Sequence, residues 1–138
     1  MLIMVHAMWG MAIAAYTRNI IFLLFGGIGG HILLDAIPHQ DLTTVRQVLV
    51  DITLGTMVYV IFSRIYSLPL YFAWAVLFST LPDIDVALYS YGVWKRSYFP
   101  SHFPSMHGQP ASPYGKLMNI TVGVILFMVF LMRMKKGN

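Results

Sequence analysis

Five apolar segments, separated by short polar breaks, constrain the fold of this chain more than any other feature. They cover residues 2–16, 20–37, 47–63, 69–88 and 117–132. A helix needs about 20 mostly apolar residues to cross a membrane, and these segments approach that length. Of the 138 residues, 58% are hydrophobic and only 10% are charged, whereas a soluble domain carries about 25% charged residues. The sequence therefore predicts an all-α integral membrane bundle of about five transmembrane helices, in a single transmembrane domain over residues 1–138.

The lengths of the segments and loops add detail to this prediction. The first and fifth segments are short, so we expect either of them to be tilted or to cross the membrane only in part. Residues 89–116 form one long loop with four prolines and two histidines, and long loops within compact chains are usually functional or disordered. The G-x-x-x-G spacing from Gly26 to Gly30 predicts close packing of the second helix against a neighbour.

The composition also excludes several functional classes. The chain has no Cys, which excludes disulfides, thiolate metal sites and a cysteine nucleophile. Its net charge of +4 comes from scattered Lys and Arg residues, which is ordinary at the ends of membrane helices. We therefore expect membrane lipid rather than nucleic acid as its partner. No basic stretch or cleavage site flanks the first segment, so we expect a retained helix and a multi-pass protein of the cell membrane.

Threading five helices through a bilayer places every acid and every histidine in one half of the molecule. We name the side that holds residue 1 side A, and the opposite side, which holds residue 138, side B. The chain has no Glu, and side A receives all five aspartates and all five histidines: Asp35, Asp41, Asp51, Asp83, Asp85, His6, His31, His39, His102 and His107. Side B receives only basic residues. Polar residues are common at helix ends, but an Asp inside a membrane helix costs about 2.5–3.5 kcal/mol and usually marks a functional site.

The spacing of these residues indicates a metal site. His31, Asp35 and His39 are each four residues apart, so on a continuous helix they would stack on one face. Pro38 would remove His39 from that face if the helix ends before it. Mixed imidazole and carboxylate ligands suit zinc, and also manganese or iron, better than calcium or magnesium. The predicted metal ligands are His6, His31, Asp35, His39, Asp83 and Asp85, which are enough for one or two ions. On a regular helix Asp83 and Asp85 face apart, and they converge only if Pro82 disturbs that turn.

The loop histidines and a neighbouring Asp have different predicted roles. His102 and His107 are the expected catalytic residues, acting as general acid or base or closing the site. Nearby serines lack a recognisable oxyanion element, which argues against a serine nucleophile. Asp51 lies in about the first turn of the third helix, where stabilising the N-terminus of that helix, orienting a ligand and binding metal all stay open as its role.

Three motifs, HAMWG, LPDID and FPSMHG, resemble the bacterial membrane-bound metal-dependent hydrolase family, whose substrates are largely unknown. The residues that match the family's motifs are His6, Asp83, Asp85 and His107. Val86 stands where the family has a histidine, and Met106 and Gly108 flank His107 where it has Thr and Ser. GHILLDAIPHQD is also loosely similar to the zinc-ligating helix of zinc-dependent phospholipase C enzymes. The resemblance implies a bacterial inner-membrane location and a metal-dependent hydrolase.

Three functions stay open from the sequence alone. The leading expectation is a membrane-embedded divalent-metal-dependent hydrolase that acts on a lipid-linked or phosphoester substrate. The alternative is a metal-binding or metal-transporting membrane protein without hydrolytic activity. A structural or assembly protein, whose polar residues merely decorate helix ends, is the third.

Overall fold

The computed structural model describes residues 1–40, 44–103 and 114–137, and all regular structure within these ranges is helical. The elements are α1 Ile3–Ala14, α2 Ile20–Asp35, α3 Val45–Tyr66, α4 Leu70–Ser90, the 3₁₀ helix η1 Pro100–His102, and α5 Gly115–Gly137. The predicted all-α class is confirmed, because no strand occurs in the described ranges.

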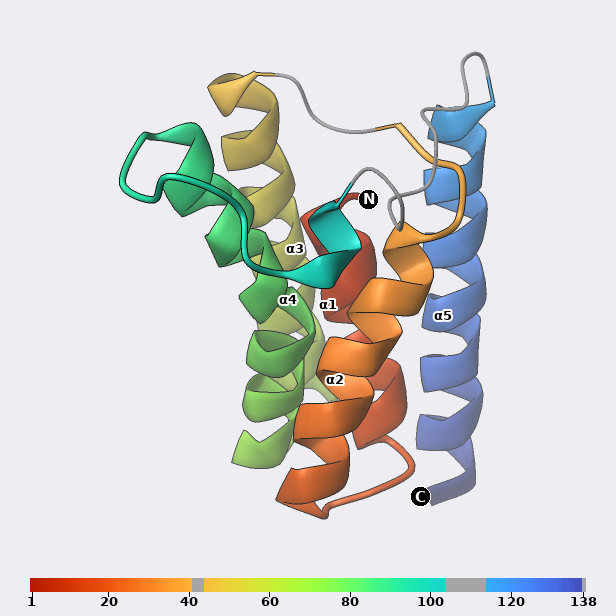
Figure 1. Cartoon of the computed structure of the whole chain (residues 1–138). Coiled ribbons are helices and arrows are strands. Elements are labelled where there is room, and N and C mark those ends of the chain that lie inside the picture. Colours follow the sequence, from red (N-terminus) through yellow and green to blue (C-terminus); the bar gives the residue numbers. More distant parts are fainter. Residues whose placement is uncertain (41–43, 104–113, 138) are drawn as a thin grey trace.

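Successive helices run in opposite directions along the bundle (Figure 1). The starts of α1, α3 and α5 and the ends of α2 and α4 lie at one end of the molecule, drawn at the top, which is side A. The segment that carries η1 folds back across this end, in front of the start of α1. Helix α1 is central, since it packs against each of the other four α-helices.

Three of the helices are long and apolar enough to cross a membrane, namely α3, α4 and α5. Helices α1 and α2 are apolar but have only 12 and 16 residues, which correspond to about 18 and 24 Å at 1.5 Å per residue. A bilayer's hydrocarbon core is about 30 Å thick. The first segment is short, as predicted. The fifth is not, because α5 continues past its apolar stretch through Arg133 and Lys135 and has 23 residues.

Polar side chains cap the N-termini of three helices. Asn19 accepts hydrogen bonds from the first turn of α2, and Thr44 and Gln47 form a capping box at the start of α3. Asp51, on α3, caps a different helix, because its carboxylate accepts a 2.6 Å hydrogen bond from the first backbone N–H of α1. A carboxylate at a helix start satisfies an unpaired donor and complements the helix dipole. Asp51 thus fixes the start of α1 against α3.

Pro82 lies inside α4 without ending it, and the helix runs on to Ser90. Its nitrogen cannot donate to the carbonyl of Phe78, so one bond is missing from the ladder of this turn. The rest of the helix stays regular. Asp83 and Asp85 therefore remain two positions apart on one helix and face different surroundings.

Close approaches at glycines bring α1 against its neighbours. A Cβ added at Gly10 would lie 2.5 Å from the carbonyl oxygen of Ala75, and one at Gly30 would lie 1.8 Å from Nε1 of Trp9. The same Trp9 nitrogen donates a 2.8 Å hydrogen bond to the carbonyl of Gly26. Both ends of the G-x-x-x-G spacing therefore contact α1, which confirms the predicted close packing.

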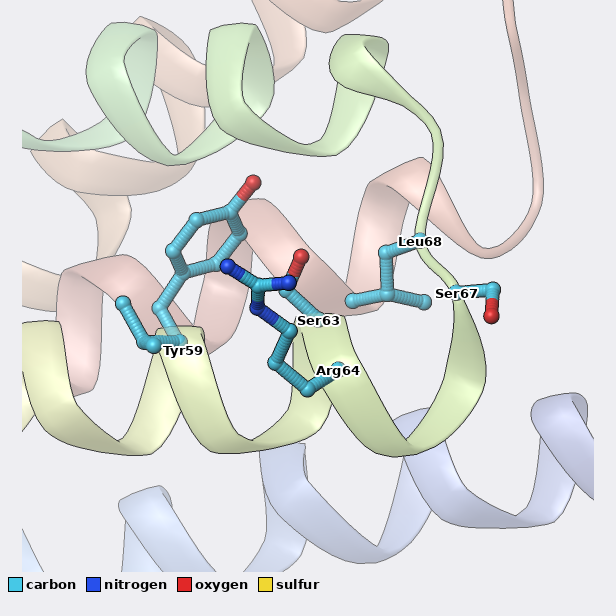
Figure 2. Close-up of a pocket in the computed structure, with 6 residues that line it drawn as sticks. Tyr59, Ser63, Arg64, Ser67 and Leu68 are labelled. Carbon is cyan, nitrogen blue, oxygen red and sulfur yellow. The ribbon is translucent and has the colours of Figure 1, made fainter.

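Two hollows lie away from side A. One, of about 580 Å³, sits at the end of α3 and is lined by Tyr59, Val60, Ser63, Arg64, Ser67 and Leu68 (Figure 2). The other, of about 630 Å³, is an apolar groove between α1, α2 and α5. Neither hollow is lined by a histidine or an aspartate.

Candidate metal centre

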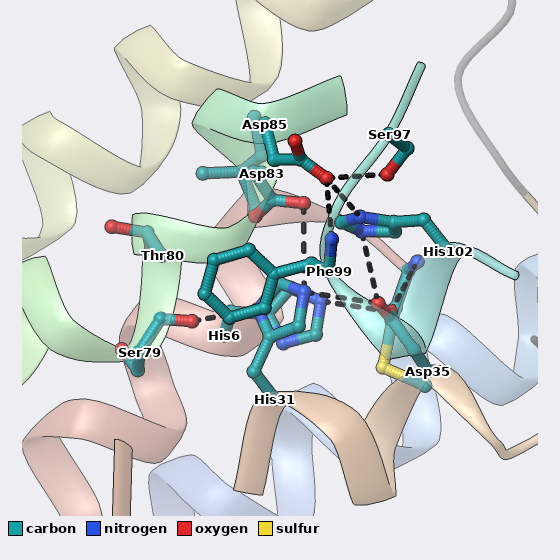
Figure 3. A network of polar contacts seen from close by, with 12 residues as sticks. His6, His31, Asp35, Ser79, Thr80, Asp83, Asp85, Ser97, Phe99 and His102 are labelled. Carbon is teal, nitrogen blue, oxygen red and sulfur yellow. Dashed lines mark hydrogen bonds and ion pairs between the residues drawn. The ribbon is translucent and has the colours of Figure 1, made fainter. Parts of the chain in front are cut away.

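Five side chains from four elements meet on side A (Figure 3). We call them the His/Asp cluster: His6 from α1, His31 and Asp35 from α2, Asp83 from α4 and His102 from η1. The side chains of His6 and His31 are 0% exposed, and that of Asp35 is 1% exposed. No Lys or Arg of the described ranges forms an ion pair with either aspartate. The cluster is therefore a set of carboxylates and imidazoles with three buried members, while Asp83 is 20% and His102 9% exposed.

His31 is held so that one ring nitrogen faces the other members. Its Nδ1 lies 2.8 Å from the carbonyl oxygen of Ser79, and because a carbonyl only accepts, Nδ1 carries the hydrogen. Nε2 then lies 2.9 Å from Oδ2 of Asp35 and 3.9 Å from Oδ1 of Asp83, without a hydrogen bond. Histidine ligands of metal ions are commonly oriented in this way, with the second nitrogen bonded to a carbonyl or carboxylate.

The two oxygens of Asp35 have different neighbours. Oδ1 lies 3.0 Å from the Met1 nitrogen and accepts a hydrogen bond from Nε2 of His6 at 3.1 Å. Oδ2 has no hydrogen bond, although Nε2 of His31 lies 2.9 Å away and Nε2 of His102 lies 3.5 Å away. The His6 ring also stacks on that of His31, with centroids 3.8 Å apart. One oxygen thus orients the carboxylate, and the other faces the imidazoles.

The separations between these donor atoms suit a common cation. Donors about 2.0–2.1 Å from a tetrahedral zinc ion lie roughly 3.3 Å from one another, and the separations of 2.9, 3.5 and 3.9 Å span that value. Two groups of three residues place donor atoms within 4.8 Å of one another: His6, His31 and Asp35, and His31, Asp83 and His102. Oδ2 of Asp83 is likewise buried without a hydrogen bond. Several unsatisfied acceptors in one buried space favour a bound cation.

Asp85 faces the loop instead of the centre of the cluster. Its carboxylate accepts hydrogen bonds from the backbone N–H of Tyr98 and of Phe99, each at 2.9 Å, and from the hydroxyl of Ser97. Oδ2 also lies 3.7 Å from Nδ1 of His102. The predicted ligand Asp85 thus anchors the segment that brings His102 over the cluster.

His39 lies beyond the helical face on which the sequence places it. Helix α2 ends at Asp35, ahead of Pro38. The imidazole is buried, with Nδ1 2.6 Å from the carbonyl oxygen of Ile37 and Nε2 2.5 Å from the Met1 nitrogen. The predicted column of three ligands therefore reaches the cluster only through His31 and Asp35.

Two contributors to the site were not predicted from the sequence. Ser79 acts through its backbone carbonyl, which no residue type identifies, next to the turn that Pro82 weakens. Ser97 acts through its hydroxyl on Asp85, and a serine in a long loop gives no distinguishing signal. Asp51 caps the start of α1 and not that of its own helix α3, so its contribution to helix stability falls on a different helix from the one expected.

The residues that resemble the metal-dependent hydrolase family fall in three places. His6 and Asp83 belong to the His/Asp cluster, Asp85 holds the loop beside it, and His107 lies outside the described residues, as does Asp41. Comparisons with models of protein families, with curated proteins and with solved structures find no match to this chain.

Proposed function

We propose that this protein is a membrane-embedded hydrolase whose divalent metal ion binds at the His/Asp cluster. One observation carries the proposal. Nε2 of His31 and Oδ2 of Asp35 are two buried acceptor atoms 2.9 Å apart, and neither has a hydrogen bond. Two acceptors at that distance repel each other unless a cation lies between them, either a proton on Nε2 or a metal ion. A metal ion would satisfy both.

The membrane location rests on helix length and on exposed apolar residues. Helices α3, α4 and α5 could each cross a bilayer, and α3 exposes apolar side chains along its length, including Leu49, Met57 and Ile61. In water such a surface would promote aggregation, whereas lipid tails cover it at no cost. We propose that α1 and α2 complete a five-helix bundle in the cell membrane, held within it by the three longer helices.

The described residues offer one metal position rather than two. Both candidate groups of ligands contain His31, and this residue has only Nε2 to offer, because Nδ1 donates to Ser79. One lone pair binds one ion. We propose His31 as the ligand common to both groups, with Asp35 and Asp83 as the carboxylates nearest its Nε2, at 2.9 and 3.9 Å. His6 would orient Asp35 through its other oxygen.

The donor set favours zinc, with manganese or iron as the other candidates, because imidazoles and carboxylates suit all three. When bound, such an ion supplies a water molecule activated for attack at neutral pH. His102 lies 3.5 Å from Oδ2 of Asp35, so its Nε2 is close enough to accept a proton at the site. We propose His102 as the general base, placed there by the segment that Asp85 holds.

The proposed substrate class follows from where the cluster lies. It lies in the side A half of the bundle, where α1 begins and α2 ends, beside η1, and α3 and α5 extend further in the same direction (Figure 1). We propose that the head-group region of a bilayer reaches this level. A lipid-linked substrate with a phosphoester bond would bring its reactive group to that depth. The proposal is thus a lipid-linked or phosphoester substrate, cleaved by water.

The metal content of the purified protein tests whether the His/Asp cluster binds a metal ion. Wild-type protein, purified in detergent without chelator, is expected to hold about one Zn, Mn or Fe per chain by elemental analysis. A His31→Ala/Asp35→Ala variant is expected to lose it while keeping the same elution volume and helical circular dichroism. Metal-free wild-type protein, or equal metal in the variant, would overturn the proposal.

A metal-binding protein without hydrolytic activity is the second candidate, and one observation favours it. The two hollows described above lie away from the cluster, which is closely covered by η1. A metal transporter is less well supported, because side B carries no acid or histidine to continue a path for a cation. Hydrolysis of a panel of phosphoesters and lipids, lost on chelation and restored by the metal, would support the hydrolase. Metal uptake into proteoliposomes would support transport.

A further inference from the structure

The apolar groove between α1, α2 and α5 has the dimensions of a ligand site. Its volume of about 630 Å³ falls within the range of about 300–1,000 Å³ that small-molecule sites occupy. It follows α1 from Trp9 to Tyr16, which is roughly 10 Å at 1.5 Å per residue. No charged side chain lines it.

Small residues and one indole shape the groove. Ala12 and Gly26 leave space between α1 and α2, while Leu126 and Val129 form the wall on α5. Trp9 lines the end nearer side A, where its indole is held by the hydrogen bond to the carbonyl of Gly26. The groove is therefore an open apolar surface that follows α1 from Trp9 to Tyr16.

The side chain of Arg133 lies beside Tyr16, at the side B end of the groove. Nε of Arg133, on α5, donates a 3.2 Å hydrogen bond to the carbonyl of Ala15, and its Cζ lies 5.6 Å from the ring centre of Tyr16. Tyr16 itself lines the groove. An arginine side chain stays protonated in proteins and has five N–H donors, so several remain for an anion beside the groove.

The charge of the surrounding surface has the same sign. Side B carries no acidic residue, and besides Arg133 it has Arg18, Arg64 and Lys135. Arg64 lines the hollow at the end of α3, together with Tyr59 and Ser63 (Figure 2). Clusters of basic residues at the membrane surface attract anionic lipid head groups.

We propose that the groove binds one acyl chain of an anionic phospholipid from the leaflet on side B, with its phosphate at Arg133. The order of parts in such a lipid matches the order found here, an apolar groove followed by a cation beside Tyr16. The proposal rests on the membrane location proposed above. It does not depend on the metal site, which lies beyond Trp9 toward side A.

Native mass spectrometry of the purified protein tests this, with phosphatidylglycerol and phosphatidylcholine added in equal amounts as probes. The wild-type protein is expected to retain one phosphatidylglycerol at least fivefold more often than one phosphatidylcholine. Val129→Phe should abolish retention of either lipid by filling the groove. Val124→Phe, the same change at an exposed position of α5 outside the groove, should leave retention unchanged.

Substitution of the basic residues tests the second part of the proposal, that Arg133 binds the phosphate. Arg133→Gln should remove the preference for phosphatidylglycerol, and Lys135→Gln should keep it. Both residues are exposed, so these variants decide the matter even if Val129→Phe fails to fold. Equal retention of the two lipids by the wild-type protein, or an unchanged preference in Arg133→Gln, would overturn the proposal. Metal content should be the same in all four variants, so a failure here is distinguishable from a failure of the metal site.

Discussion

Nδ1 of His31 donates to the carbonyl oxygen of Ser79 at 2.8 Å, and this bond determines which nitrogen of His31 faces Asp35. The donor comes from α2 and the acceptor from α4, so the packing of these two helices sets the orientation of the imidazole. The hydroxyl of Ser79 is not involved, because it donates to the carbonyl of Val76.

Replacing His31 and His39 in turn tests which histidine of this segment binds metal. Both side chains are buried, but only His31 points an unbonded nitrogen at the cluster. His31→Ala should remove most of the bound metal, whereas His39→Ala should retain it at the wild-type level. Elemental analysis of the two purified variants decides between them. Equal loss of metal in the two variants would instead support the sequence prediction that His31, Asp35 and His39 are all ligands.

Asp85→Ala should release the segment of residues 97–102 without removing a metal ligand. The variant loses the acceptor for the N–H groups of Tyr98 and Phe99, so hydrogen–deuterium exchange at these amides should rise. Metal affinity should fall by about 10–100-fold, as is typical when a group that supports a metal site is removed.

Asp83→Ala provides the matched control, since it removes a proposed ligand from the same helix. Metal should be lost, while exchange at Tyr98 and Phe99 stays at the wild-type rate. If Asp85→Ala leaves that exchange unchanged, Asp85 does not hold the loop.

Two glycine substitutions should change stability in opposite directions. In Gly10→Ala the new methyl group would lie 2.5 Å from the carbonyl oxygen of Ala75, and overpacking of this kind costs about 1–3 kcal/mol. In Gly29→Ala it would meet nothing within 4 Å, and Ala in a helix is favoured over Gly by roughly 0.5–1 kcal/mol. Thermal unfolding in detergent should show a lower Tm for the first and an equal or higher Tm for the second. A higher Tm for Gly10→Ala would contradict the packing of α1 on α4.

Asp51→Ala should weaken the start of α1. Losing a side chain that caps a helix costs about 0.5–2 kcal/mol, and Asp51→Asn should cost less because it keeps an acceptor oxygen. Metal content is expected to be unchanged, since Asp51 lies outside the His/Asp cluster. Thermal unfolding measures the first effect and elemental analysis the second. Loss of metal in Asp51→Asn would instead indicate that Asp51 takes part in the proposed metal site.

Much of the fold could be predicted from the sequence, because apolar length and helix ends are local properties. Each of the five predicted segments coincides with a helix, and the difference at α5 arose because basic residues continue that helix beyond its apolar stretch. Side A also gathers His31 and Asp35, as predicted, since residues four apart on one helix share a face.

The detailed roles within the site could not be predicted in the same way. Asp83 and Asp85 share one motif, and only the course of the following loop determines that Asp85 binds backbone amides there. His39 falls past the end of α2, where helical spacing no longer applies. The support of His31 by Ser79 is a contact between backbone and side chain across two helices, which residue type does not reveal.

The central place of α1 has a consequence for biogenesis. This helix packs against four partners, and every one of them follows it in the chain. A ribosome therefore delivers α1 before any surface exists to bury His6, and α1 must wait until α4 has been inserted before His31 can meet Ser79. The His/Asp cluster can therefore come together only after α4 and η1 have been made.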